Sequence, residues 1–226
     1  MFRASTFVVP CLAALALAIA TCGCSGKGGT ASPPAKAAPA IEQKPTTQEE
    51  PKVPAKPAPA RPVVIIETSM GTIKAELWPD LAPETAANFL RYVDEKFYDG
   101  LIFHRVIPGF MIQGGGFMSD MREKPAGTAI RNEAAATLRN DRGTLAMART
   151  NQVNSATSQF FINLVNNDAL NHKDGTPQGF GYCAFGKVTE GMDVVDEIAK
   201  VQTGNRPPHQ NVPVEPVVIK TIRKAG

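Results

Sequence analysis

Cysteine and histidine are scarce in this chain of 226 residues, and their positions exclude two common kinds of site. The cysteines are Cys11, Cys22, Cys24 and Cys183, so the long region after residue 24 has one thiol and cannot form a disulfide by itself. The histidines, His104, His172 and His209, lack the spacing of zinc ligands. We therefore expect no disulfide framework and no metal in the folded part, where Cys183 is a small buried side chain.

An excess of charge of one sign is also lacking. The chain has 24 Lys and Arg residues against 21 Asp and Glu residues, and the basic residues form no block that could bind phosphates. We therefore expect no nucleic-acid partner. Hydrophobic residues make up 43% of the sequence, which suits one globular domain with additional segments.

The longest apolar run, at residues 7–20, follows Arg3 near the N-terminus. It is short and rich in alanine for a membrane span, whereas a positive start, an apolar run and small residues are typical of an export signal. Because Thr21-Cys22-Gly23-Cys24-Ser25 comes next, residues 1–24 resemble the signal peptide of a bacterial lipoprotein, in which a cysteine carries the lipid.

Two cysteines compete for that role. Gly23 directly before Cys24 favours Cys24, which we expect to carry the lipid, and Ile19 three residues before Cys22 makes Cys22 the alternative. The resemblance implies an exported protein that is lipid-anchored to a bacterial membrane and faces the periplasm, with the inner and outer membranes both open. An ordinary cleaved signal with a released product is the alternative.

Residues 25–61 change composition sharply, to Pro, Ala and Lys with almost no large apolar side chains. Such a segment cannot bury enough surface to offset its ordering entropy. Since its prolines favour extended conformations, we expect a disordered, semi-stiff tether with a reach on the order of 100 Å. A filler segment without a spacing role is the alternative.

From residue 62 to residue 226 the pattern is that of a folded, mainly β domain. Residues 63–68 and 72–78 predict a hairpin, residues 217–222 a final strand, and two helices are expected from Pro83 and over 192–200. Short apolar stretches lie between them, at residues 102–107, 110–113, 144–148, 159–164 and 182–188. Many short strands with two helices favour a closed antiparallel barrel that the helices cap.

Three segments of this domain resemble the signature of the cyclophilins. They are FHRVIPGFMIQGG at residues 103–115, SQFFIN at residues 158–163, and FGKV followed by EGMDVV within residues 185–195. The resemblance covers nearly all of residues 62–226, and AMART at residues 146–150 is closest to the bacterial branch. It implies an eight-stranded barrel and peptidyl-prolyl cis/trans isomerase activity.

The chemistry of X–Pro rotation explains why an arginine suits this site. The rotation barrier is about 18–20 kcal/mol, while cis and trans differ by only about 0.5–1 kcal/mol, so the reaction needs acceleration. In the twisted transition state the proline nitrogen gains a lone pair, and a donor aimed at it stabilises that state selectively. The resemblance assigns this catalytic role to Arg105, with no nucleophile, metal or cofactor required.

The resemblance also implies a substrate groove. An apolar slot for the proline ring would be lined by Phe110, Met111, Phe161 and Leu170, with Tyr182 as a further aromatic wall. Gln113 would hold a substrate carbonyl and orient Arg105, and Ala148, Thr150 and Gln159 would border the peptide before the proline. His104 is interpreted as structural, because the mechanism needs no acid or base.

The sequence departs from the family pattern at several places. Ala169 stands where many members have a tryptophan associated with cyclosporin binding, so we expect weak inhibition by cyclosporin without loss of catalysis. Tyr182 replaces a common histidine, and the altered loop at residues 152–157 leaves the peptide preference before proline open.

The expected partners are proline-containing segments of exported proteins, with the membrane contacted through the lipid alone and a monomer as the default. Two alternative functions are also compatible with this sequence. A binding module would grip proline-containing segments without catalysis, and an envelope scaffold would depend on the tether.

Overall fold

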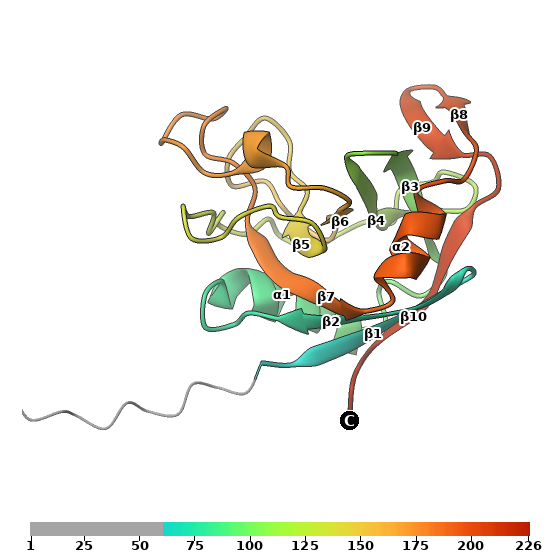
Figure 1. Cartoon of the computed structure of the whole chain (residues 1–226), viewed down its shortest axis with the longest axis horizontal. Coiled ribbons are helices and arrows are strands. Elements are labelled where there is room, and N and C mark those ends of the chain that lie inside the picture. Colours follow the sequence, from blue (N-terminus) through green and yellow to red (C-terminus); the bar gives the residue numbers. More distant parts are fainter. Residues whose placement is uncertain (1–60) are drawn as a thin grey trace, which may run out of the picture. The chain divides into compact units, whose positions relative to one another are not determined.

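The computed structural model describes residues 61–226 (Figure 1). The predicted signal at residues 1–24, with Cys22 and Cys24, and the predicted tether as far as residue 60 lie outside the described residues. Arg61, which the sequence analysis assigned to the tether, forms ion pairs with Glu76 at 3.1 Å and Asp80 at 2.9 Å. It therefore belongs with the folded domain.

With three additions, η1, β8 and β9, the elements follow the predicted order. They are β1 (Val63–Thr68), β2 (Gly71–Leu77), α1 (Pro83–Asp94), β3 (Leu101–Ile107), β4 (Met111–Met118), β5 (Thr144–Met147), β6 (Phe160–Asn163), the 3-10 helix η1 (Asp168–Leu170), β7 (Ala184–Glu190), α2 (Met192–Ile198), β8 (Thr203–Arg206), β9 (His209–Pro213) and β10 (Val217–Lys224). Within residues 61–226, no helix has the length and apolar character needed to cross a bilayer.

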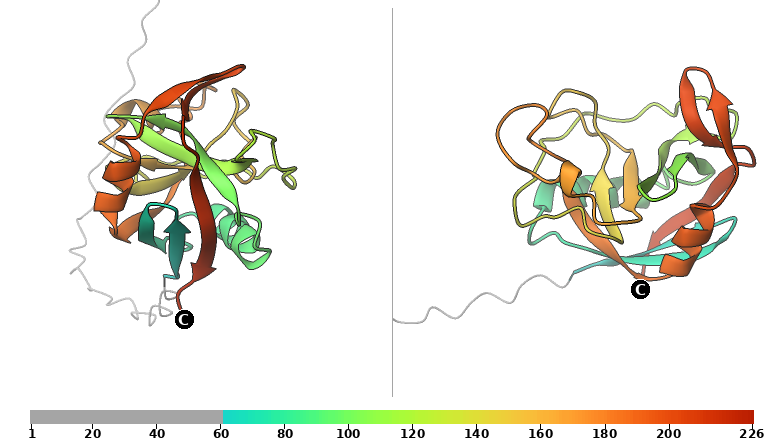
Figure 2. Two further views of the ribbon diagram at one scale, coloured as in Figure 1. Left: turned by 90° about the vertical axis from the view of Figure 1, so that its right-hand side faces the viewer. Right: turned by 45° about the horizontal axis from the view of Figure 1, so that its top comes forward.

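The strands close into an antiparallel barrel in the order β1-β10-β3-β4-β6-β5-β7-β2 (Figures 1 and 2). Strand β1 pairs with both β2 and β10, so the first and last strands of the barrel are neighbours. Helix α1 packs near β7 and β10, and α2 packs near β2. The predicted mainly β fold, an eight-stranded barrel with two helices, is confirmed.

Alternating side chains build the core from the first hairpin onward. Ile66 and Ile73 are cross-strand partners with no exposed surface, because the period of two along each strand points them to the same face. Phe89 of α1 then inserts its ring among Tyr98, Phe160 and Phe185, with ring centroids 5.2, 5.3 and 5.1 Å away. This aromatic cluster fixes β6 and β7, which carry part of the site, against α1.

Two strand predictions need correction. The stretch predicted at residues 110–113 is a longer strand, β4, which continues through Gly114, Gly115 and Gly116 to Met118. Glycines weaken the sequence pattern of a strand, but here Gly115 has φ +83° and the register with β3 shifts on either side of Phe103. The glycines therefore mark β-bulges in a paired strand.

The second correction concerns residues 203–213, for which no strand was predicted. They form a separate two-stranded sheet, β8 and β9, beside β3 (Figure 1). Its sequence, TGNRPPHQNVP, is rich in proline and polar residues and lacks alternation. Backbone pairing and packing on the barrel, rather than local propensity, hold this hairpin in place.

A distant carboxylate caps the first helix. Pro83 begins α1 as predicted, but Ala82 offers no side-chain cap. Glu133 supplies it instead, since its carboxylate accepts hydrogen bonds from the backbone N–H groups of Glu84 at 3.1 Å and Thr85 at 2.7 Å. The Thr85 hydroxyl donates a third, at 2.6 Å. The loop around residue 133 is thereby tied to α1.

Removal of this cap should destabilise the fold measurably. Glu133→Ala is expected to lower the free energy of unfolding by about 1.5 kcal/mol and Tm by roughly 3–6 °C, because the N–H groups at the start of α1 lose their acceptor. Thermal unfolding followed by circular dichroism measures the effect. Glu133→Gln, which keeps one accepting oxygen, should lose less, and an equal loss in both variants would contradict the capping role.

Candidate active site

Arg105 lies at the start of a chain of polar side chains on neighbouring strands. It stands on β3 opposite Gln113 of β4, and its Nη1 donates to Gln113 Oε1 at 3.4 Å. Gln113 Nε2 in turn donates to Gln159 Oε1 at 3.0 Å. Since this is the single hydrogen bond of the Arg105 guanidinium to the described residues, most of its donors remain available to a ligand.

An apolar pocket of about 110 Å³ opens beside Arg105. Its lining includes the predicted residues Phe110, Met111, Gln113, Ala148, Phe161, Leu170 and Tyr182. Met111 and Phe161 are almost fully buried and form its deep part, whereas Leu170 and Tyr182 are half-buried at its rim. A charged donor therefore borders an apolar slot that leads to the surface.

Thr150 and Gln159 lie outside this pocket, in an adjoining hollow that also includes Ala148. The backbone N–H of Thr150 already donates to Ser155 Oγ at 2.9 Å, and its carbonyl accepts from Arg149 at 3.0 Å. The Gln159 side chain packs closely against the bulged strand β4. A Cβ atom added at Gly116 would lie only 2.6 Å from Gln159 Cγ. The glycine at 116 makes room for the Gln159 side chain.

Arg149 also lines the pocket, although it is not among the site residues predicted from the sequence. Its guanidinium lies 4.8 Å from the centre of the Tyr182 ring and donates to the carbonyls of Gly181 at 3.0 Å and Pro177 at 2.8 Å. The Tyr182 ring also meets Phe161 edge-on, at 5.7 Å. Arg149 thus fixes an aromatic wall, and no local sequence pattern indicates that role.

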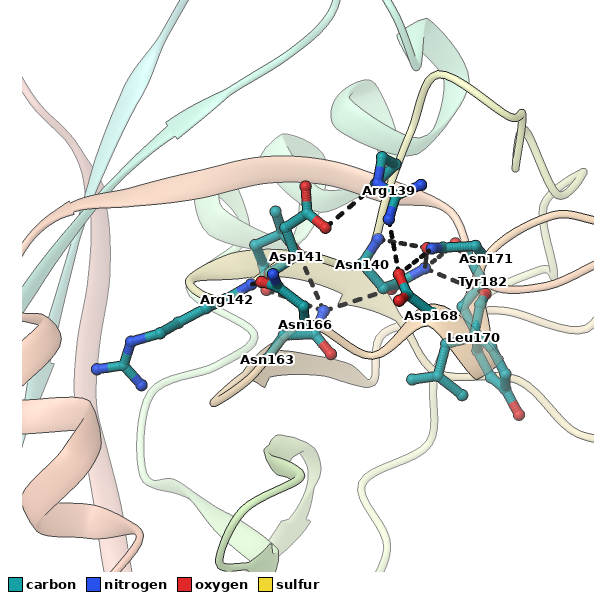
Figure 3. A network of polar contacts seen from close by, with 11 residues as sticks. Arg139, Asn140, Asp141, Arg142, Asn163, Asn166, Asp168, Leu170, Asn171 and Tyr182 are labelled. Carbon is teal, nitrogen blue, oxygen red and sulfur yellow. Dashed lines mark hydrogen bonds and ion pairs between the residues drawn. The ribbon is translucent and has the colours of Figure 1, made fainter.

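Behind the pocket, a buried asparagine binds two of its walls (Figure 3). Asn140 has no exposed surface, and its Nδ2 donates to the carbonyls of Leu170 and Tyr182, each at 3.1 Å. Its backbone N–H donates to Asn171 Oδ1 at 2.7 Å. The side-chain amide of Asn140 therefore connects η1, which contains Leu170, to the residues just before β7, which include Tyr182.

The network continues from Asn140 to the third side of the pocket. Asn163 Nδ2 donates to Asn140 Oδ1 at 3.3 Å, and Asn163 Oδ1 accepts from Asn167 Nδ2 at 2.7 Å. Asn167 also donates to the carbonyl of Phe110 at 2.9 Å. Asn163 and Asn167 are four residues apart, but Asn140 and Asn163 are 23 residues apart, so the contact with Asn140 follows from the fold.

His104 precedes Arg105 but points into the protein. It is buried, and its Nδ1 has no hydrogen-bond partner. Burial lowers the pKa of its imidazole to about 4, with smaller contributions from His209 and Arg105. The imidazole ring is therefore neutral near pH 7, as expected for a buried side chain with a structural role.

This low pKa predicts a pH effect on stability. Between about pH 4 and 6.5 the unfolded chain binds a proton at His104 that the folded chain does not, so folding weakens by up to about 3 kcal/mol as pH falls through that window. His104→Leu should show a smaller loss in urea unfolding at acid pH. In NMR, the native His104 ring signals should stay constant from about pH 5 to 8; a midpoint near 6.5 would refute this.

Cys183 is buried as expected, with 4% of its surface exposed. Burial raises the pKa of its thiol to about 11, and the Thr85 hydroxyl lies 3.6 Å from Sγ. The thiolate needed for reaction is therefore rare near neutral pH.

The comparisons with known proteins agree with this geometry. Residues 63–224 match the family described as cyclophilin type peptidyl-prolyl cis-trans isomerase/CLD. Peptidyl-prolyl cis-trans isomerase cyp18 of Streptomyces antibioticus is 56% identical over 163 residues, which cover 72% of this chain and 98% of that protein. Peptidyl-prolyl cis-trans isomerase B of Escherichia coli K12 is 53% identical over 160 residues, 71% of this chain and 98% of that protein.

Solved structures give the same result. A cyclophilin type peptidyl-prolyl cis-trans isomerase of Cryptosporidium parvum superposes with a TM-score of 0.60 at 28% identity, covering 74% of this chain and 98% of that one. A second structure of it, in the presence of the dipeptide Ala-Pro, gives 0.59, covering 73% and 99%. The chain described here belongs to the cyclophilin-type peptidyl-prolyl cis-trans isomerases.

Proposed function

We propose that Arg105 accelerates X–Pro rotation by donating a hydrogen bond to the proline nitrogen of the twisted amide. The observation that supports this is the position of Arg105 at the edge of the apolar pocket, with its guanidinium tethered by Gln113 at 3.4 Å. The proline ring would occupy the slot formed by Met111 and Phe161, while the amide lies against the guanidinium. A preoriented donor stabilises the pyramidal nitrogen more than the planar amide.

The cellular part of the proposal comes from the N-terminal sequence. A lipoprotein-like signal with Cys24 or Cys22 and a proline-rich tether would hold the isomerase at a bacterial membrane, facing the periplasm. Its substrates would be exposed X–Pro bonds of exported proteins during folding. The reaction consumes no ATP, which suits that compartment.

Exchange spectroscopy tests the catalytic proposal. The purified protein is added to a short Ala-Pro peptide, and cis–trans exchange is measured by NMR. We expect exchange far faster than the uncatalysed rate of tens to hundreds of seconds. Binding of the peptide by a folded protein without faster exchange would contradict the proposal and favour a module that only grips proline-containing segments.

Export and anchoring need a separate test. Metabolic labelling with a fatty acid in a bacterial host should label the native chain, and Cys24→Ser or Cys22→Ser should abolish the label. Labelling that persists in the double variant, or a fully soluble periplasmic product, would contradict the lipid anchor.

A further inference from the structure

A second hollow, much larger and more polar than the proline pocket, adjoins it at Arg105. We call it the hairpin hollow, because β3 and β4 form one side and residues 208–211 of the β8–β9 hairpin form the other. Its volume is about 500 Å³. Arg105, Gln113 and Arg149 line both this hollow and the proline pocket, so the two are continuous.

Tilted and edge-on aromatic contacts help to hold the hairpin against the barrel. Phe117 of β4 lies between His104 and His209, with ring centroids 4.6 Å from the first and 4.8 Å from the second. His104 and Phe117 are buried. The wall opposite Arg105 is therefore a packed part of the fold.

The chain direction of a bound peptide assigns this hollow to one side of the proline. The proline pocket shares Ala148 with the smaller hollow and Arg105 with the hairpin hollow. Gln113 and Arg149 line all three, and Gln159 lines both hollows. The family resemblance places the residues before proline along Ala148 to Thr150. An extended peptide that crosses the proline pocket would then direct the residues after proline, each about 3.3–3.6 Å further on, into the hairpin hollow.

The charges that line the hairpin hollow have one sign. It contains Arg105 and Arg149 but no aspartate or glutamate, whereas the smaller hollow contains Glu123 as well as Arg149 and lacks Arg105. Within residues 61–226, every hydrogen bond of these two guanidinium groups goes to an uncharged amide or carbonyl oxygen. Their charges are thus not neutralised by a neighbouring carboxylate.

We propose that the hairpin hollow is a subsite for the residues that follow proline and that it favours acidic side chains there. This inference rests on the proposed isomerase function, whose substrate preference it specifies. The proposal adds β8–β9 to the substrate-binding surface. It also implies that the charge preference of the site differs between the residues before proline and those after it.

Blocked peptides with the sequence Ala-Ala-Pro-Ala-Xaa-Ala test the preference, with Glu, Gln or Lys at Xaa. Exchange NMR at low salt should give a kcat/KM about fivefold higher for Glu than for Lys, and added salt should reduce the difference because both partners are partly exposed. In Gln210→Glu, an isosteric change that places a negative charge in the hollow, the ratio should fall to one or below. Gln202→Glu, the same change outside the hollow, should keep the native ratio.

The outcomes separate the two proposals. Fast exchange of all three peptides at one rate would overturn the subsite and leave the isomerase function intact. A preference for Glu that survives Gln210→Glu would also overturn it, because the preference would then arise elsewhere. No exchange with any peptide would remove the catalytic proposal and the subsite together.

Discussion

Replacement of Arg105 by alanine is expected to lower kcat/KM for Ala-Pro peptides on the order of a hundredfold, which corresponds to about 3 kcal/mol of transition-state stabilisation. The reason is that the guanidinium would be the donor to the pyramidal nitrogen, while the apolar slot formed by Met111 and Phe161 binds the proline ring in both planar and twisted states. Exchange NMR at several peptide concentrations should show the loss mainly in kcat.

The same variant should remain folded. Among residues 61–226, the Arg105 side chain makes one hydrogen bond, a long one of 3.4 Å, so the Tm of the variant should shift by no more than a few degrees. Arg105→Lys keeps a charge but loses the planar fork and is expected to recover activity only partly. Arg131→Ala, an exposed arginine outside the proline pocket, serves as the control. Full activity in folded Arg105→Ala would refute the mechanism.

The second large effect is expected at Asn140. Asn140→Ala should lower the free energy of unfolding by about 3 kcal/mol and Tm by roughly 6–12 °C, because the carbonyls of Leu170 and Tyr182 lose a buried donor and Asn163 loses an acceptor. Urea unfolding followed by fluorescence or circular dichroism measures the loss. Asn151→Ala, at an exposed position in a loop, is the matched control and should be nearly neutral.

The network should also act on the proline pocket. Since Asn140 binds the backbones of two pocket walls, peptides should show a higher KM in Asn140→Ala at a temperature where the variant is folded. A buried asparagine with only a structural part would change Tm and leave KM at the native value. The two measurements thus separate support of the fold from support of the site.

Much of the barrel could be predicted because its strands carry period-two patterns. Val64 and Ile66 alternate with less buried residues in β1, and β2 repeats the pattern, so the hairpin was evident. Arg105 and the lining of the proline pocket were identified from motifs that resemble a family, and the structure brings most of them to one place. Geometry alone leaves their roles as predictions.

The remaining features could not be predicted because they depend on contacts between distant segments. Glu133 caps a helix that begins 50 residues earlier in the chain, as its bonds to Glu84 and Thr85 show. Asn140 is 23 residues from Asn163, and no local pattern indicates that their side chains bind each other. Hairpin β8–β9 lacks a hydrophobic pattern, and its position depends on the edge-on contact of His209 with Phe117.

The pairing of β1 with β10 has a consequence for the order of events during synthesis. The barrel strand that comes last in the sequence, Val217–Lys224, is also the one that joins β1 to β3. A chain that emerges with its N-terminus first leaves the edges of β1 and β3 unpaired until this strand has followed. Closure therefore requires the whole domain, and the isomerase cannot act on other chains before its own synthesis is complete.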